Sequence, residues 1–196
     1  MKSLGFVFKY VKRYKGPLAL TMGSMILLVG IALAGSDREE EEENLQELSD
    51  RLKRGAYRAK PVRRAYIPKG DGRQRPLGVT ALEDKIVQRS AASVLGAVYE
   101  SDFMGFSYGF RPGRSAHDAI EKIFQLSRSG SSKLWVVDAD IKGCFDNIDH
   151  GPLLRSLGMF PASREVRAWL KAGYMESGVL HATDSGTPQG GVISPL

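Results

Sequence analysis

Residues 134–145 read LWVVDADIKGCF, a short apolar run that ends in two aspartates and leaves through a glycine. The run is rich in β-branched residues and has the length of a strand, so we predict a buried strand over residues 134–141. Two acids at the end of an apolar strand are costly to bury unless they are paired or bind a metal ion. The alternative is that Asp138 and Asp140 lie at the solvent-exposed edge of a sheet.

Magnesium is the metal that suits this strand end. A carboxylate at Asp140, together with carbonyl and phosphate oxygens, is a hard-oxygen site, and the sequence has no Cys/His cluster that would favour zinc. A second segment, GTPQGG at residues 186–191, has the composition of an open turn. We expect both segments to belong to one site. Cys144 is the single cysteine, which excludes an intramolecular disulfide, and we interpret it as a packing residue.

Composition indicates one ordinary domain with an appendage. The chain has 196 residues, of which 42% are hydrophobic and 26% charged, and its net charge is +6. Positive and negative side chains are equal in number over residues 1–43, so the whole excess of positive charge lies in residues 44–196. Residues 51–75 hold ten Lys and Arg and one acid, Asp71. This density predicts either a polyanion-binding surface or a solvated basic face.

The appendage is apolar. Residues 17–34 contain no charge over eighteen positions, close to the ~20 that cross a bilayer as a helix. Basic residues precede the run and acidic residues follow it, which would keep the N-terminus in the cytoplasm. A secretory signal is the alternative. We therefore divide the chain into an apolar helix (1–35), an acidic linker (36–43) and a globular domain (44–196).

Within the domain, Leu45, Leu48 and Leu52 predict a helix that ends near Gly55. Prolines within residues 57–68 suggest an edge strand, and residues 69–73 have the form of a hairpin tip. A capping box at residues 80–83 and a second one starting at Ser115 predict two more helices. The apolar face of the first comprises Ile86, Val87, Ala91, Val94, Leu95 and Val98, and that of the second comprises Ala119, Ile120, Ile123 and Phe124.

Residues 44–196 resemble the N-terminal half of the reverse transcriptase domain of group II intron-encoded proteins, the reverse transcriptase/maturases. Six segments in the order typical of that family carry the likeness: PVRRAYIPK (61–69), RPLGV (75–79), EDKIVQ (83–88), YGFRPGRSAH (108–117), and residues 140–150 and 185–196. The resemblance implies an α+β fold comprising the fingers and partial palm of a right-hand polymerase. It also implies a cytoplasmic RNA-directed DNA polymerase, or a membrane-bound one if residues 17–34 insert.

The resemblance also implies roles for particular residues. Asp140 matches the first catalytic aspartate, and the carbonyl of Ile141 matches a neighbouring ligand of the Mg2+ ions that assist nucleotide addition. The nucleotide-binding positions of the family are matched by Lys69, Arg75, Phe145 and Gln189. The implied partners are intron RNA, or an RNA template with a DNA primer, and deoxynucleoside triphosphates.

Other polar residues leave alternatives. Arg63 and Arg64 belong to the basic segment and are candidate nucleic-acid contacts, while Arg111 and Arg114 either hold template phosphates or pair with a neighbouring acid. For Asp146 and Asp149, helix capping is favoured over metal binding. Asp138 is assigned a supporting role, and His117 a structural one.

The sequence departs from the family's pattern in one motif. The next family motif has an aromatic residue, a variable residue and two aspartates, whereas these 196 residues contain no adjacent pair of aspartates. We therefore expect a truncated enzyme that is inactive alone. The alternatives are an RNA-binding remnant, a membrane-tethered fusion protein, and a split polymerase completed by another chain. Without its pairing hairpin, the predicted strand at 134–141 would expose an unpaired edge and apolar surface.

Overall fold

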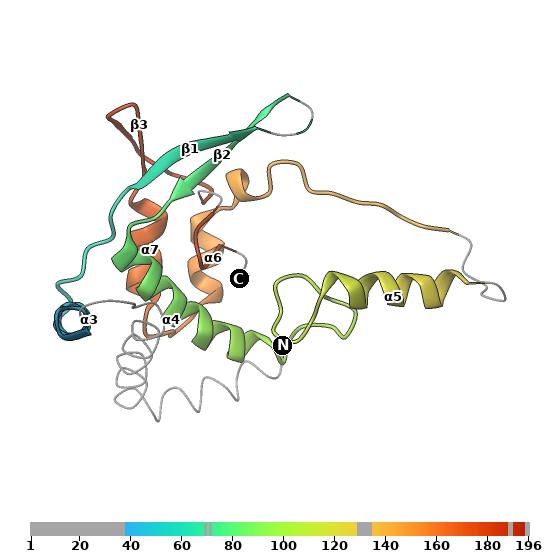
Figure 1. Cartoon of the computed structure of the whole chain (residues 1–196), viewed down its shortest axis with the longest axis horizontal. Helices are drawn as coiled ribbons and strands as arrows, with labels where there is room; N and C mark the ends of the chain where they lie inside the picture. Colours follow the sequence, from blue (N-terminus) through green and yellow to red (C-terminus); the bar gives the residue numbers. More distant parts are fainter. Residues whose placement is uncertain (1–37, 69, 71, 129–134, 188–189, 195–196) are drawn as a thin grey trace.

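The computed structural model describes residues 38–68, 70, 72–128, 135–187 and 190–194. Helices and strands alternate irregularly along this part of the chain (Figure 1), which is the mixed α and β composition that the sequence predicts. The elements are α3 (Arg38–Lys53), β1 (Val62–Pro68), β2 (Gln74–Val79), α4 (Leu82–Tyr99), α5 (Ala116–Ser127), the 3-10 helix η1 (Phe145–Asn147), α6 (His150–Ser156), α7 (Ser163–Lys171), β3 (Tyr174–Glu176) and β4 (Val179–His181).

The apolar N-terminal helix predicted at residues 1–35 lies outside the described residues. Among the helices that are described, none is both long and apolar enough to cross a bilayer.

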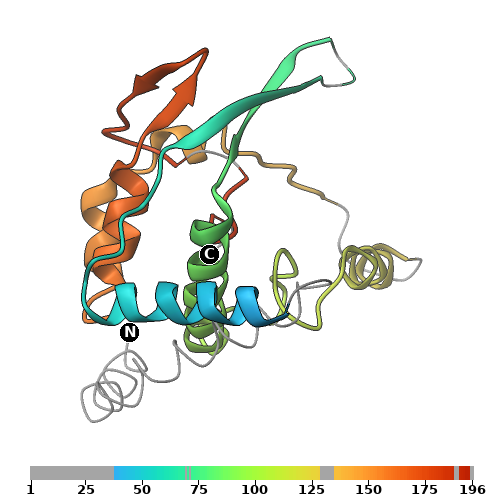
Figure 2. The same cartoon turned by 60° about the vertical axis from the view of Figure 1, so that its left-hand side comes forward.

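Four short strands form one mixed sheet in the order β2-β1-β3-β4. β1 and β2 are antiparallel, with Ile67 opposite Arg75, so the predicted hairpin is confirmed. β1 runs parallel to β3 only at Val62 and Arg63, and the rest of the hairpin projects from the body (Figures 1 and 2). β1 has a strand on both sides only at its first residues, and the predicted edge strand is confirmed for the rest of β1, which pairs with β2 alone. Pro61 precedes β1 and Pro68 ends it, so neither proline occupies the stretch that pairs on both sides.

α3 packs on α4 through the face that its leucine spacing predicts. Leu45 and Leu48 are buried in a cluster with Tyr57, Ile86 and Val87, and the helix ends just before Gly55, whose φ is +70°. α3 begins at Arg38, so residues 38–43 of the predicted acidic linker are helical and continue into the helix of the domain. Glutamates in the first turns of a helix interact favourably with the positive end of its dipole, which explains why this run joins the helix.

α4 lies between two hydrophobic clusters and connects them. One side of α4 contacts α3, and the other packs Ala91 and Leu95 against α6, α7 and their connection. In Figure 2, α3 crosses in front of α4 while α6 and α7 lie to one side. The members of the second cluster are Ala91, Leu95, Leu157, Phe160, Ala162, Val166 and Leu170. The predicted apolar face of α4 is therefore buried on both sides.

The start of α4 differs from its prediction. The N-cap is Ala81, which makes no side-chain capping bond, so the capping box predicted from Thr80 to Glu83 is wrong. Glu83 is occupied elsewhere, because it accepts a hydrogen bond from Arg51 at 2.8 Å and pairs with Lys60 at 3.2 Å. A carboxylate with two cationic partners gains more from them than from one backbone N–H.

α5 has the predicted capping box but not a buried face. Asp118 N–H donates to the Ser115 hydroxyl at 3.2 Å, and Ser115 N–H donates to the Asp118 carboxylate at 2.7 Å. Ile120, Ile123 and Phe124 are nevertheless exposed, and α5 stands apart from the other helices in both views (Figures 1 and 2). Local capping thus starts the helix, while burial requires a neighbour that the described residues do not supply.

The segment after α5 is extended but belongs to no strand. Residues 135–141 lie outside the four-stranded sheet, and Trp135, Val137 and Ile141 are 93%, 89% and 74% exposed. The prediction of a buried strand is wrong, because a strand is buried only where neighbouring strands supply hydrogen bonds and a layer covers it. The exposed apolar surface expected for an unpaired segment is present. Leu134 lies outside the described residues.

The ion pairs of Glu83 make stability depend on pH. Hydrogen bonds hold the pKa of Glu83 below its ordinary value of 4.5. The bond from Arg51 has the larger effect, and the bond from Lys60 the smaller one. A lowered pKa in the folded state contributes stability above the unfolded pKa, and this is lost as pH falls through the folded pKa. We expect Glu83→Gln to lower the melting temperature at about pH 7 and to change it much less at about pH 3.

The matched control for Glu83→Gln is Glu47→Gln, because Glu47 also faces Arg51 but at 3.6 Å and with a more exposed side chain. Its effect on the melting temperature should be smaller at about pH 7. Equal losses for Glu83→Gln at both pH values would contradict the assignment.

Candidate functional site

The structure brings the two predicted segments of the site together. Thr187 N–H donates to the Phe145 carbonyl at 2.8 Å, and Gly186 N–H donates to the Ile148 carbonyl at 2.8 Å. His150, which is buried, donates from its Nε2 to the Gly186 carbonyl at 2.6 Å. Three hydrogen bonds therefore attach residues 186–187 to η1 and to the start of α6.

Glycine at position 186 is required by two features of this contact. Its φ is +72°, and a Cβ there would lie 2.6 Å from the Asp146 carbonyl oxygen and 2.7 Å from that of Phe145. Both neighbours are backbone atoms held in a short helix, so they cannot move aside cheaply.

Asp140, the predicted catalytic aspartate, is exposed at the end of the extended segment. The backbone turns just after it, where Cys144 N–H donates to the Ile141 carbonyl at 3.3 Å and the Asn147 side chain donates to the Gly143 carbonyl at 2.7 Å. Asp149 caps α6 by accepting from Gly151 N–H at 2.9 Å, as predicted. The turn thus delivers Asp140 next to η1 but leaves its carboxylate open to solvent.

The described residues do not by themselves fit a magnesium ion. Within residues 38–68, 70, 72–128, 135–187 and 190–194, no three His, Cys, Asp or Glu side chains gather to hold a metal. Magnesium demands six oxygen ligands in near-octahedral geometry, and a two-metal site needs several carboxylates. Asp140 and the Ile141 carbonyl would supply only two ligands.

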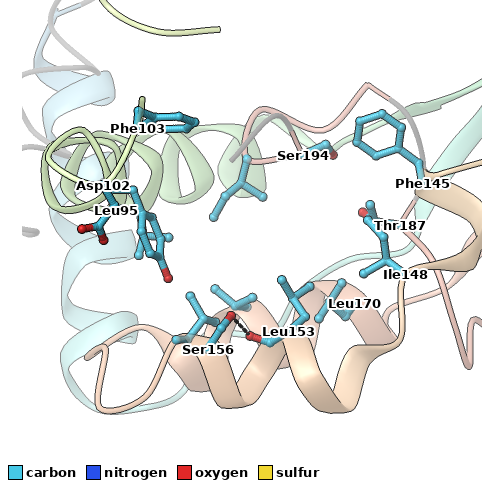
Figure 3. A pocket seen from close by; sticks show the side chains of 14 residues that line it. Leu95, Asp102, Phe103, Phe145, Ile148, Leu153, Ser156, Leu170, Thr187 and Ser194 are labelled. Carbon is cyan, nitrogen blue, oxygen red and sulfur yellow. Dashed lines mark hydrogen bonds between the residues drawn. The ribbon is translucent and has the colours of Figure 1, made fainter. Parts of the chain in front are cut away.

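Phe145 lies at one end of an apolar pocket of about 560 Å³. Figure 3 shows Phe145 and Thr187 on one side, with Leu95, Asp102 and Phe103 on the other. α4, α6 and α7 supply most of the apolar lining, and few polar groups face the space. Phe145 therefore borders an apolar cavity, which offers little for binding a charged ligand.

The hairpin separates the two arginines predicted to act together. Side chains alternate along a strand, so Arg63 and Arg64 point to opposite faces. Arg75 lies opposite Ile67 and therefore shares the face of Arg63. Arg64 is half-buried on the other face, with its guanidinium carbon 3.8 Å from the centroid of the Tyr174 ring. Arg63 and Arg75 are thus exposed on one face of the described hairpin. Lys69 lies outside the described residues.

Arg111 is committed to internal contacts. It is 8% exposed and forms a two-point ion pair with Glu100, at 2.5 and 3.2 Å. It also donates to the carbonyls of Met104 and Ser107. These bonds from Arg111 hold the pKa of Glu100 below its usual value. Of the two alternatives predicted for Arg111, the structure therefore shows pairing with an acid.

Arg114 differs from Arg111, because it is exposed and has fewer internal contacts. It donates to the Gly105 carbonyl at 3.1 Å and lies 5.5 Å from the Tyr108 ring centroid. Its guanidinium remains accessible to a phosphate. His117 lies exposed in the first turn of α5, where the sequence assigned it a structural role. Gln189 falls outside the described residues.

Sequence reasoning missed the polar residues buried under the site. Asp84 is fully buried and accepts hydrogen bonds from the Tyr57 hydroxyl and, at 3.0 Å, from Lys60 N–H. The Trp169 indole donates to the Tyr57 oxygen at 2.7 Å. Burial has the largest effect on the pKa of Tyr57 and raises it, and the hydrogen bond to Asp84 raises it further. The hydroxyl of Tyr57 therefore stays protonated. The available signal was a polar pair, Asp84 and Gln88, spaced one turn apart within an apolar helix stripe.

This joined pair of segments, beside a basic hairpin, is the arrangement expected of a template-copying polymerase. The chain belongs to the reverse transcriptase family, because residues 67–196 match Reverse transcriptase (RNA-dependent DNA polymerase). Similar proteins include the group II intron-encoded protein LtrA of Lactococcus lactis subsp. cremoris, 42% identical over 160 residues. Protein YkfC of Escherichia coli (strain K12) is 43% identical over 158 residues. The resemblance to group II intron-encoded proteins is thus confirmed.

These relatives are longer than the chain. The match to LtrA covers 79% of this chain and 26% of LtrA, and the match to YkfC covers 78% of this chain and 42% of YkfC. The putative COX1/OXI3 intron 1 protein of Saccharomyces cerevisiae is 35% identical over 157 residues, which are 78% of this chain and 18% of that protein. The chain therefore spans about a quarter of LtrA and less than half of YkfC.

The close contact at Gly186 gives a direct test of the site's geometry. Gly186→Ala adds a clash with two carbonyl oxygens to the strain of a positive φ, and we expect it to lower the unfolding free energy by on the order of 3 kcal/mol. Gly178→Ala is the matched control, because its φ is +83° but open space surrounds it. It should cost about 1–2 kcal/mol. Equal losses in chemical denaturation would show that the contact with η1 is not tight.

Proposed function

We propose that this chain is the fingers and partial palm of an RNA-directed DNA polymerase of the group II intron maturase type. The observation that carries the proposal is the direct bonding of residues 186–187 to η1, beside the hairpin that presents Arg63 and Arg75. Its substrates would be an RNA template, with a DNA primer, and deoxynucleoside triphosphates. Intron RNA is the corresponding maturase partner.

The proposed roles follow from chemistry and position. Arg75, with Lys69, would hold the triphosphate, since a guanidinium pairs with phosphate through two parallel hydrogen bonds. Phe145 would pack under the sugar, and Gln189 would act near the nucleotide and template. Arg63 and Arg114 are exposed and would contact nucleic-acid phosphates. Arg64 and Arg111 would instead have structural roles. Arg64 stacks on Tyr174, and Arg111 pairs with Glu100.

Asp140 would contribute one carboxylate to a magnesium site that needs further carboxylates, which the described residues do not bring together with it. Magnesium, when bound, neutralises charge on the phosphates. The chain's own part would be to hold Asp140 beside η1 and Phe145 at the border of the apolar pocket.

We expect no primer extension by the isolated 196-residue chain with Mg2+, an RNA template, a DNA primer and deoxynucleoside triphosphates. A single aspartate cannot hold two cations close together. The control is a complete reverse transcriptase under the same conditions. Templated synthesis by the wild-type chain that is lost in Asp140→Ala would contradict this expectation and would show that the chain completes its own metal site.

Binding should persist without synthesis. We expect the chain to bind a primer annealed to an RNA template in a salt-sensitive manner, because phosphate contacts release counterions. The double variant Arg63→Gln/Arg75→Gln should reduce the slope of log affinity against log salt concentration by about 1.4–1.8. Asp140→Ala should leave the affinity unchanged.

The control for this experiment is Arg155→Gln/Arg167→Gln, which removes the same charge from exposed positions on α6 and α7. Its salt slope should stay close to that of the wild type. An unchanged affinity for Arg63→Gln/Arg75→Gln in an electrophoretic or fluorescence assay would refute the hairpin as the binding surface.

A second candidate is an RNA-binding protein without polymerase activity. The observation that favours it is the exposed arginine pair of the hairpin, which needs no metal site to attract phosphates. Binding with no extension by the chain, even when a polypeptide carrying the family's aspartate-pair motif is added, would favour this second candidate.

A further inference from the structure

Gln88 is buried in the middle of α4 and reaches outside its own helix. It is 4% exposed, and its Oε1 accepts a hydrogen bond from Val192 N–H at 3.1 Å. The acceptor must be the carboxamide oxygen, since the backbone N–H can only donate. A buried carboxamide is costly unless it is bonded, so this contact both satisfies Gln88 and fastens residue 192 to α4.

The chain around Val192 lies close to both β2 and α4. A Cβ on Gly190, whose φ is +105°, would lie 3.2 Å from the Gly78 carbonyl of β2. A Cβ on Gly191 would lie 3.5 Å from Gln88 Oε1. The Leu77 side chain, on the same hairpin face as Arg75, lies 3.9 Å from the Gly190 Cβ position. Residues 190–192 therefore lie directly against β2 and α4.

Residues 186–187 are held separately from residues 190–192. His150 bonds the Gly186 carbonyl, and Phe145 accepts from Thr187 N–H. Residues 186–187 are thus attached to η1, which carries Phe145, and residues 190–192 lie against β2, which carries Arg75. Gln88 is the side chain that secures the second attachment. Along the chain, two residues separate the two attached segments, so the length of that connection limits the distance between η1 and β2.

We propose that Gln88 is a positioning residue, which sets residues 190–192 against the hairpin and so fixes Arg75 relative to Phe145. The inference rests on the function proposed above, because it takes these two side chains as parts of one nucleotide site. Gln88 itself would touch no substrate. It acts through the backbone of residue 192 and the contact between Gly190 and Gly78.

The test compares three variants of the full chain by hydrogen–deuterium exchange without ligand. Gln88→Met keeps the volume but removes the acceptor, so peptides within residues 186–194 should exchange roughly tenfold faster, the effect of losing one hydrogen bond. Gln88→Glu keeps an acceptor oxygen and should restore slow exchange there. Arg89→Gln, on the exposed side of α4, should match the wild type. Peptides from α3 should be unchanged in all three.

Two results would overturn the proposal. One is wild-type exchange at residues 186–194 in Gln88→Met. The other is faster exchange over the entire chain in both Gln88 variants, which would make Gln88 a packing residue only. The proposed function would fail in a different experiment, the binding assay, if the wild type showed no salt-sensitive binding to a primer on an RNA template. Since the exchange experiment contains no nucleic acid, the two failures are distinguishable.

Discussion

The described structure depends on the buried carboxylate of Asp84. Burying a charged group is strongly unfavourable unless hydrogen bonds replace its water, and here the Tyr57 hydroxyl and Lys60 N–H do so. Trp169 of α7 extends the network by donating to Tyr57. Asp84 thereby ties together α4, the segment that leads into β1, and α7. Because these bonds are directional, they determine how the hairpin leaves the body, which apolar packing alone would specify less tightly.

α4 carries this arrangement along its length. Its first turns bind the entrance to the hairpin through Glu83 and Asp84, and its next turn binds residue 192 through Gln88. Its apolar residues pack on α3 on one side and on α6 and α7 on the other. One helix therefore supports both the basic hairpin and residues 190–192. This explains how a site can be assembled from segments more than 100 residues apart without a large sheet.

Local patterns predicted the elements that depend on local interactions. Leucine spacing located α3, the Ser115 and Asp118 pair located the start of α5, and the turn residues near position 70 located the hairpin. Predictions failed where a residue distant in sequence competed for a side chain, or where an element required a distant segment as its partner. Glu83 pairs with Arg51 and does not cap α4. Residues 135–141 form no strand, because a strand needs a neighbouring strand to pair with. The same reasoning missed Asp84 and Gln88, whose partners are distant in sequence.

The sequence by itself determined the family and the order of its motifs, since residue types at set spacings carry that information without coordinates. It also determined that the segments around Phe145 and Gly186 contain the glycines that a close backbone approach requires. Only the tertiary structure decided which arginines are available, placing Arg63 with Arg75 on one face and enclosing Arg111 against Glu100. The physical reason is that exposure and pairing depend on contacts between distant segments, which exist only after the chain has folded.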